Sequence, residues 1–203
     1  NEDEATNYKN NIAIFCEAMK NAPNETKRVL LVDLWQQMID LGFENVANYI
    51  SETYLIDIAK KLNDKELIEG LTLFKNTSLG SKAPDFSFEI EKEGKNITKK
   101  LSELYIAENY IVVFWSSTCS HCLDEIPHLQ TFIKSQDAEK LKVIAIGLEE
   151  EPYNWKNLTY DYPEFIHVYG EGKWDNEIGN SYGVTATPSY FILNKDKEII
   201  GKP

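Results

Sequence analysis

Residues 110–122 read Tyr110-Ile-Val-Val-Phe-Trp115-Ser-Ser-Thr-Cys119-Ser-His-Cys122, and this stretch decides the fold. The unbroken apolar run from Tyr110 to Trp115 is typical of a strand that is covered on both faces. Two cysteines separated by two residues follow it, at the expected start of a helix over roughly residues 120–136. We therefore expect a buried strand that delivers a cysteine pair to the N-terminus of a helix.

The sequence around this stretch predicts an α/β domain. Residues 85–90 alternate between apolar and polar side chains, and residues 141–148 form a second nearly continuous apolar run. Residues 189–193 and 198–200 flank a polar turn, as in a hairpin. A further helix is expected over roughly residues 174–182. Strands that alternate with helices before a terminal hairpin predict a mixed sheet flanked by helices.

The first part of the chain, residues 10–76, predicts a small all-helical domain instead. Its apolar side chains recur at helical spacing in four segments, marked by Ile12/Phe15/Met19, Leu31/Leu34/Trp35/Met38, Ile50/Tyr54/Ile58/Leu62 and Leu67/Leu71/Phe74. Asn63 or Asp64 is expected to cap the last helix. The small-residue segment Ser78–Pro84 then breaks the pattern. We predict a helical bundle over residues 1–80 and an α/β domain over residues 81–203.

Composition and charge exclude several classes of protein. The chain carries 33 acidic against 21 basic residues, a net charge of −12, and Arg28 is its only arginine. This balance argues against nucleic acid as a partner, because phosphate binding relies on clustered basic residues. No apolar run reaches the ~18 residues that a membrane span requires. Three cysteines are too few for a disulfide scaffold.

The position of the cysteine pair predicts redox chemistry. A helix N-terminus offers unpaired N–H groups and a positive dipole end, and both stabilise a thiolate. Cys119 is thus the candidate nucleophile, and Cys122, one turn into the helix, is placed to resolve a mixed disulfide. His121 would favour the thiolate further if its ring pointed toward Cys119.

Two other interpretations of the pair are weaker. A structural zinc site usually needs four ligands, commonly in two separated pairs, and besides this pair only His121, His128 and His167 are potential nitrogen ligands. An inert buried pair would seldom open a helix after a core strand. We therefore expect neither a metal nor a cofactor. The third cysteine, Cys16, is expected to be a small buried hydrophobic residue.

Residues from about 82 to 203 resemble the thioredoxin superfamily, and specifically the TlpA/ResA-like extracytoplasmic thiol–disulfide oxidoreductases. Trp115 stands four residues before Cys119, and Pro127 stands five residues after Cys122 where the family kinks its active-site helix. The segment 182–193, which contains Thr187-Pro188, matches the family's cis-proline segment. The resemblance implies a thioredoxin-like fold, and it does not cover the helical part of the chain.

The resemblance also implies roles for individual residues. Pro188 corresponds to the cis-proline beside the cysteine pair, and Thr187 would offer backbone groups to a bound peptide. Glu125 corresponds to the family's acidic residue and would accept the Cys122 proton, whereas Asp124 is expected to face solvent. The expected catalytic residues are Cys119, Cys122 and Glu125, and the expected substrate-binding residues are Trp115, His121, Thr187 and Pro188.

The chain departs from the family pattern in three places. Thr118 stands where many members have tryptophan, which alters the apolar rim for substrate. The dipeptide Ser120-His121 replaces the Gly-Pro of reducing thioredoxins and shares its histidine with oxidising relatives, so both directions of electron flow stay open. The family's closing helix is expected to be absent after Pro203. A peroxiredoxin is disfavoured, because Ser116 stands where its threonine would be.

The predicted function is thiol–disulfide exchange with protein substrates, more as a reductase than as an oxidase. The implied partners are protein disulfides or thiols and a membrane or soluble electron-donor thiol protein. The implied location is the bacterial periplasm or cell envelope, with a membrane or lipid anchor before Asn1 as an option. The alternative is a non-catalytic scaffold whose helical domain holds a partner.

Overall fold

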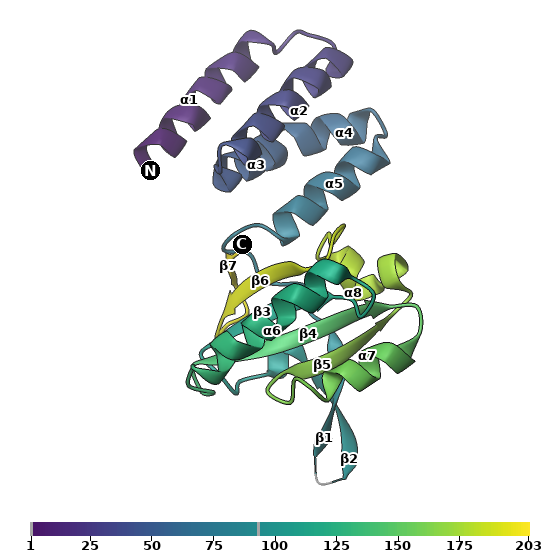
Figure 1. Ribbon diagram of the computed structural model, residues 1–203. Helices are drawn as coiled ribbons and strands as arrows, with labels where there is room; N and C mark the ends of the chain where they lie inside the picture. The colour runs from purple at the N-terminus through teal and green to yellow at the C-terminus, as the bar shows by residue number, and fades with distance from the viewer. Residues whose placement is uncertain (1, 93) are drawn as a thin grey trace. The chain divides into compact units, whose positions relative to one another are not determined.

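The computed structural model describes residues 2–92 and 94–203 (Figure 1). The chain divides into two compact units, Asn1–Lys75 and Asn76–Pro203. This division lies just before the Ser78–Pro84 segment, where the sequence pattern changes. The predicted fold class is confirmed, because an all-helical unit precedes an α/β unit with a mixed sheet.

Helices make up the first unit. They are α1 (Glu2–Ala18), α2 (Asn24–Asp40), α3 (Glu44–Ile50), the π-helical turn η1 (Ser51–Leu55), α4 (Ile56–Lys61) and α5 (Lys65–Asn76). The core of the unit includes Leu31, Ile50 and Leu71, each at most 1% exposed. Asp64 caps α5, since its Oδ1 accepts the Leu67 N–H at 3.1 Å. Of the two predicted capping residues, Asp64 is therefore the one that caps the helix.

Three details of this unit differ from the sequence expectations. The first helix begins at Glu2 rather than near residue 10, because its first turns are polar and carry little periodic signal. The third predicted helix is interrupted by η1, whose wider turn separates α3 from α4. Cys16 is half-buried rather than buried.

A five-stranded sheet forms the centre of the second unit, in the order β5-β4-β3-β6-β7. Its strands are β3 (Asn109–Trp115), β4 (Leu141–Glu149), β5 (Ile166–Glu171), β6 (Ser189–Asn194) and β7 (Ile199–Gly201). Strands β3, β4 and β5 are parallel, whereas β6 runs antiparallel to β3 and forms the predicted hairpin with β7. A separate antiparallel pair consists of β1 (Ser87–Lys92) and β2 (Lys95–Lys100).

Both faces of β3 are buried, as its apolar run predicts. Val113 belongs to the core beneath α6 (Ser120–Lys134) and α7 (Pro152–Thr159), and Figure 1 shows α6 lying across the sheet. Val112 and Phe114 belong to the opposite core, which contains Phe86, Phe88 and Tyr182 beside α8 (Glu177–Ser181). Each such side chain stabilises the fold by roughly 1.5–3 kcal/mol when fully buried. Two short 3₁₀ turns, η2 (Leu101–Glu103) and η3 (Lys173–Asp175), complete the unit.

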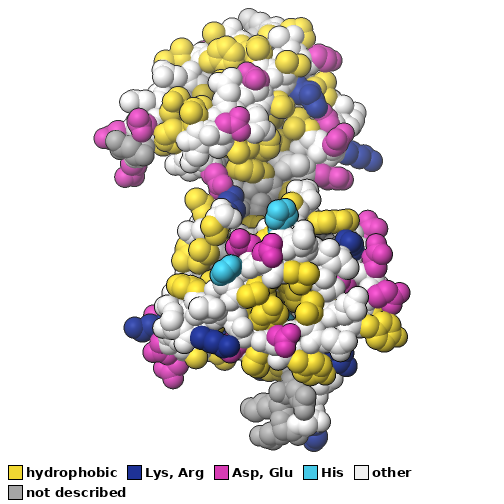
Figure 2. All heavy atoms as spheres, in the orientation of Figure 1, with side chains coloured by type: hydrophobic (Ala, Val, Ile, Leu, Met, Phe, Trp, Pro, Cys, Tyr) yellow, Lys and Arg dark blue, Asp and Glu magenta, His cyan; other side chains and the backbone are white. Residues whose placement is uncertain are grey.

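Charged side chains of both signs lie on the surface of the protein. On the face shown in Figure 2, lysine and arginine side chains are scattered among acidic ones and form no continuous basic patch. Across the described residues, none of the helices is both long and apolar enough to span a lipid bilayer.

Candidate functional site

The cysteine pair lies where the central strand gives way to α6. Strand β3 ends at Trp115, residues 116–118 form a short connection, and Cys119 is the N-cap of α6. The Cys119 Sγ accepts the backbone N–H of Cys122 at 3.2 Å, which is the contact an N-cap side chain makes to the third helical residue. The predicted placement of the pair at a helix N-terminus is therefore confirmed.

The two thiols are free and sit in different environments. Cys119 is partly exposed, whereas Cys122 is 0% exposed. Burial alone would raise the pKa of Cys119, but hydrogen bonds with the Cys122 thiol, with Thr187 and with the backbone N–H groups of Cys122 and His121 hold it below its ordinary value. Burial, together with the hydrogen bond to Cys119, raises the pKa of Cys122. The pair thus combines an accessible thiol of lowered pKa, Cys119, with a buried thiol of raised pKa, Cys122.

The Thr187-Pro188 segment lies against the pair, just before β6. The Cys119 thiol donates to the Thr187 carbonyl oxygen at 3.3 Å, although the two residues are 68 positions apart. The peptide bond between Thr187 and Pro188 is cis. This segment brings the partly exposed residues Thr187 and Pro188 to the same place as the accessible thiol.

Glu125 is exposed on α6 and shares a surface groove of about 490 Å³ with Pro188 and Tyr190. Burial raises the pKa of the Tyr190 hydroxyl, and the charges of Glu125 and then Cys122 raise it further. Both acidic groups therefore act on the same hydroxyl. Within residues 2–92 and 94–203, the Glu125 carboxylate makes no hydrogen bond or ion pair, and Asp124 is exposed as expected.

One predicted substrate-binding residue, Trp115, has a different setting from the one expected. Trp115 is only 1% exposed and packs edge-on against Tyr162, so it supports the site from the core and cannot touch a substrate in this conformation. The ring lies in the core between the sheet and α6, together with Val113 and Cys122. His121 is exposed, and its contribution to Cys119 comes from its backbone N–H.

Glu149, at the end of β4, is a site residue that the sequence reasoning missed. It is 3% exposed, and its carboxylate accepts both the backbone N–H and the hydroxyl of Ser117, two residues before Cys119. The run Glu149-Glu150-Glu151 looks like a solvated acidic turn in the sequence. Only the register of β4 against β3 distinguishes Glu149, which is buried, from Glu150 and Glu151, which are exposed.

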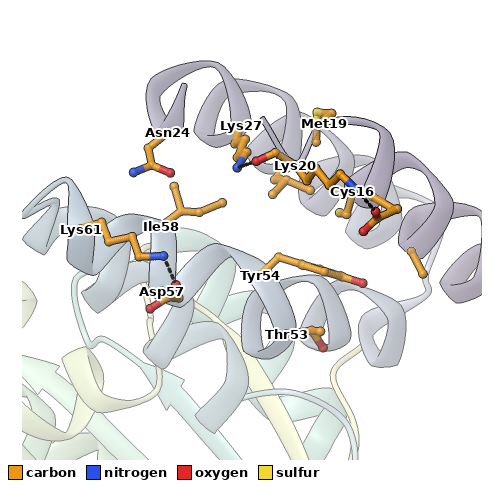
Figure 3. Close-up of a pocket in the computed structure, with 13 residues that line it drawn as sticks. Cys16, Met19, Lys20, Asn24, Lys27, Thr53, Tyr54, Asp57, Ile58 and Lys61 are labelled. Carbon is orange, nitrogen blue, oxygen red and sulfur yellow. Dashed lines mark hydrogen bonds and ion pairs between the residues drawn. The ribbon is translucent and has the colours of Figure 1, made fainter. Parts of the chain in front are cut away.

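Elsewhere in the molecule, the helical unit has a cavity of about 290 Å³ (Figure 3). Cys16, Lys27 and Tyr54 contribute to its wall. Burial raises the pKa of Cys16, and the nearby charge of Lys27 offsets this only in part. The cavity belongs to the first unit and is not part of the site around Cys119. In the described residues, no three His, Cys, Asp or Glu side chains gather as metal ligands would.

Comparisons with known proteins agree with this geometry. The family model described as Redoxin matches residues 78–202. The thiol-disulfide oxidoreductase ResA of Bacillus thuringiensis is 27% identical over 123 residues, which cover 60% of this chain and 67% of that protein.

Solved structures extend the similarity of fold. The thioredoxin domain of a thiol-disulfide oxidoreductase from Bacteroides vulgatus has a TM-score of 0.51 at 18% identity, covering 62% of this chain and 87% of that one. A thioredoxin-like protein from Bacteroides caccae has a TM-score of 0.55 at 19% identity, and it covers 96% of this chain and 78% of its own. The latter includes the helical unit in its match. The Redoxin match covers more than half of the chain, and the relatives are thiol–disulfide oxidoreductases similar to ResA with a thioredoxin-like fold; the protein therefore belongs to the Redoxin family.

Proposed function

We propose that this protein exchanges disulfides with protein substrates through Cys119 and Cys122, and that it acts mainly as a reductase. The observation that carries the proposal is the asymmetry of the pair. Cys119 is accessible and has a lowered pKa, whereas Cys122 is fully buried and has a raised one. A thiolate that meets the substrate and a thiol held back for the second step are what disulfide exchange requires.

In the proposed reaction, the Cys119 thiolate attacks one sulfur of a substrate disulfide. A mixed disulfide forms, the substrate S–S bond breaks, and the first substrate sulfur leaves as a thiolate that takes up a proton. Cys122 then loses its proton and attacks the Cys119 sulfur, which releases the second substrate thiol. The substrate gains two electrons and the enzyme pair becomes a disulfide.

Glu125 is proposed to accept the proton that Cys122 loses. Glu125 follows Cys122 by three residues on α6, which places the two side chains on the same side of the helix, and it lines one groove with Tyr190. A test is Glu125→Gln, with Asp124→Asn as the matched control on the same exposed helix. General-base removal should slow resolution of the mixed disulfide by roughly 10²-fold or more. Equal rates for both variants and the wild-type protein would remove Glu125 from the mechanism.

The substrate chain is proposed to pair with the backbone around Thr187 as an added strand. The Thr187 carbonyl is occupied by the Cys119 thiol in the dithiol state, and deprotonation of Cys119 ends that donation. The same step that activates the nucleophile thereby frees a backbone acceptor beside Pro188. His121 and Thr118, both exposed next to Cys119, would border the bound chain.

The reductase direction rests on the resemblance of residues 82–203 to the TlpA/ResA-like group. The lowered pKa of Cys119 works against it, because a stabilised thiolate favours the dithiol state. The experiment that decides is equilibration of the protein with thiol–disulfide buffers of known potential. A potential below about −250 mV supports a reductase, and one near −120 mV supports an oxidase. Full retention of disulfide reduction by Cys119→Ser would refute thiol exchange at this pair altogether.

We also propose an extracytoplasmic location, in the bacterial periplasm or cell envelope, with a thiol protein as the electron donor. The ResA-like relatives support this, and oxidising compartments are where protein disulfides persist. Fractionation of cells, with a periplasmic marker as control, tests the location. Capture of the donor on a Cys122→Ser variant as a mixed disulfide tests the partner.

A further inference from the structure

Glu149 is a buried acid with no place in the mechanism so far. Among the described residues, the charged side chains that are buried are those of Glu149, 3% exposed, and Lys197, 5% exposed. Lys197 lies in the hairpin turn between β6 and β7, where it stacks over Tyr105 and Tyr110. Glu149 instead lies beside the connection that carries Cys119. A buried charge is costly unless it is hydrogen-bonded, so its partners indicate what it does there.

The register of the sheet explains how Glu149 reaches the connection. Trp115 lies opposite Gly147, and these are the last paired positions of β3 and β4. Two residues further along each strand, Ser117 comes to the level of Glu149. There the Glu149 carboxylate accepts the Ser117 backbone N–H on Oε1 and the Ser117 hydroxyl on Oε2, the latter at 2.9 Å. The side chain thus accepts a backbone hydrogen bond beyond the end of the strand pairing.

The anchored residue lies close to Cys119 along the chain. Next to it, the Ser116 carbonyl accepts the Cys119 N–H at 3.1 Å, and the hydroxyls of Ser116 and Thr118 lie 3.0 Å apart. The connection is therefore held at Ser117 by Glu149 and at its end by α6. The contacts of the Cys119 sulfur with the Cys122 N–H and with Thr187 depend on where this connection lies.

We propose that Glu149 is a positioning residue for the nucleophile: its carboxylate fixes Ser117 and thereby holds the Cys119 sulfur at the N-terminus of α6. The inference rests on the proposed function of Cys119. It assigns to Glu149 no proton transfer and no contact with substrate. The two hydrogen bonds, rather than the charge, are what the position requires.

The test is the pH profile of Cys119 alkylation by iodoacetamide, measured in a Cys122→Ser background and followed by peptide mass spectrometry to separate Cys16. Glu149→Ala should move the profile to higher pH and slow alkylation about tenfold at pH values below the midpoint, as a one-unit rise in pKa requires. Glu149→Gln should keep the wild-type profile, because its amide oxygen can accept the Ser117 N–H and its NH₂ can bond the hydroxyl. The exposed neighbour provides the control, and Glu150→Ala should change nothing.

Each outcome separates a positioning role from a merely structural one. A Glu149→Ala protein that unfolds at lower denaturant yet keeps the wild-type profile overturns the inference, and so does a Glu149→Gln profile equal to that of Glu149→Ala. If Glu149→Ala does not fold, Ser117→Ala removes one of the two hydrogen bonds, and its profile should move in the same direction by less. An unshifted Ser117→Ala profile then overturns the inference. If Cys119→Ser still reduces disulfides, the proposed function is wrong. If the Glu149 variants reduce disulfides normally and their alkylation profiles do not shift, only the positioning role of Glu149 is wrong.

Discussion

Replacing His121 with proline or with alanine separates two ways in which this residue could acidify Cys119. The imidazole ring is exposed, and the His121 backbone N–H is one of the groups that lower the pKa of Cys119. Proline removes both the ring and the N–H, while alanine removes only the ring. Proline is tolerated in the first turn of a helix, where the N–H has no helical partner.

The expected magnitude follows from the strength of a hydrogen bond to a charged group. A hydrogen bond to a charged group contributes roughly 1.5–3 kcal/mol, and the His121 N–H is the smallest of the contributions to Cys119, so the lower end applies. That corresponds to about one pKa unit. We expect His121→Pro to raise the pKa of Cys119 by about one unit, and His121→Ala to leave it within a few tenths. Because its Cys119 thiolate is less stable, the reduced form of His121→Pro should be less favourable relative to the disulfide. Its reduction potential should therefore fall by up to about 30 mV.

The assay is iodoacetamide alkylation against pH in a Cys122→Ser background, combined with equilibration of the two-cysteine variants in thiol–disulfide buffers. Far-ultraviolet circular dichroism checks that α6 survives the proline. A His121→Ala variant that shifts the pKa as far as His121→Pro would show that the ring, and not the backbone, acidifies Cys119. The reasoning from the N-cap contacts would then be refuted.

Two further predictions concern stability. Gly147→Ala should destabilise the α/β unit by about 1–3 kcal/mol, because the new Cβ would collide with the indole of Trp155. The same change at Gly70, where a new Cβ would have nothing within 4 Å, should stabilise α5 by about 0.5–1 kcal/mol. Denaturant unfolding measures both, and a stabilised Gly147→Ala would contradict the packing described. Burial lowers the pKa of His167, so its stabilising effect is present above the unfolded value of about 6.5 and is lost as pH falls below it. Between pH 7 and pH 5, His167→Gln should therefore lose less unfolding free energy than the wild-type protein does, and equal losses would assign the pH dependence to other groups.

The parts of the fold that could be predicted from the sequence are those with a local signal. The buried strand β3 shows itself as an unbroken apolar run, and the cysteine pair marks the start of α6 within a few residues. Asp64 could be named as a cap because capping depends on neighbours three residues away. In these cases, residues that are close in the sequence determine the local structure.

The remaining features depend on contacts between distant segments. Strand β2 has mostly exposed, lysine-rich side chains, and its partner β1 is what makes it a strand. Glu149 joins the site only because β4 lies in a particular register against β3. The burial of Trp115 follows from the face of the sheet on which residue 115 falls, and no local pattern reveals which aromatic residue becomes core and which becomes rim.

The burial of Cys122 has a consequence for resistance to oxidants. Peroxide that reaches the partly exposed Cys119 thiolate would form a sulfenic acid. This acid can either be oxidised further and irreversibly or condense with a neighbouring thiol. Cys122 lies within hydrogen-bonding reach of Cys119 and is 0% exposed, so it is protected from direct attack while remaining available to that intermediate. Condensation would release water and leave the Cys119–Cys122 disulfide, which a thiol can reduce. In the proposed exchange reaction, the shielded Cys122 thiol would thus have a second role, which is to keep Cys119 from irreversible oxidation.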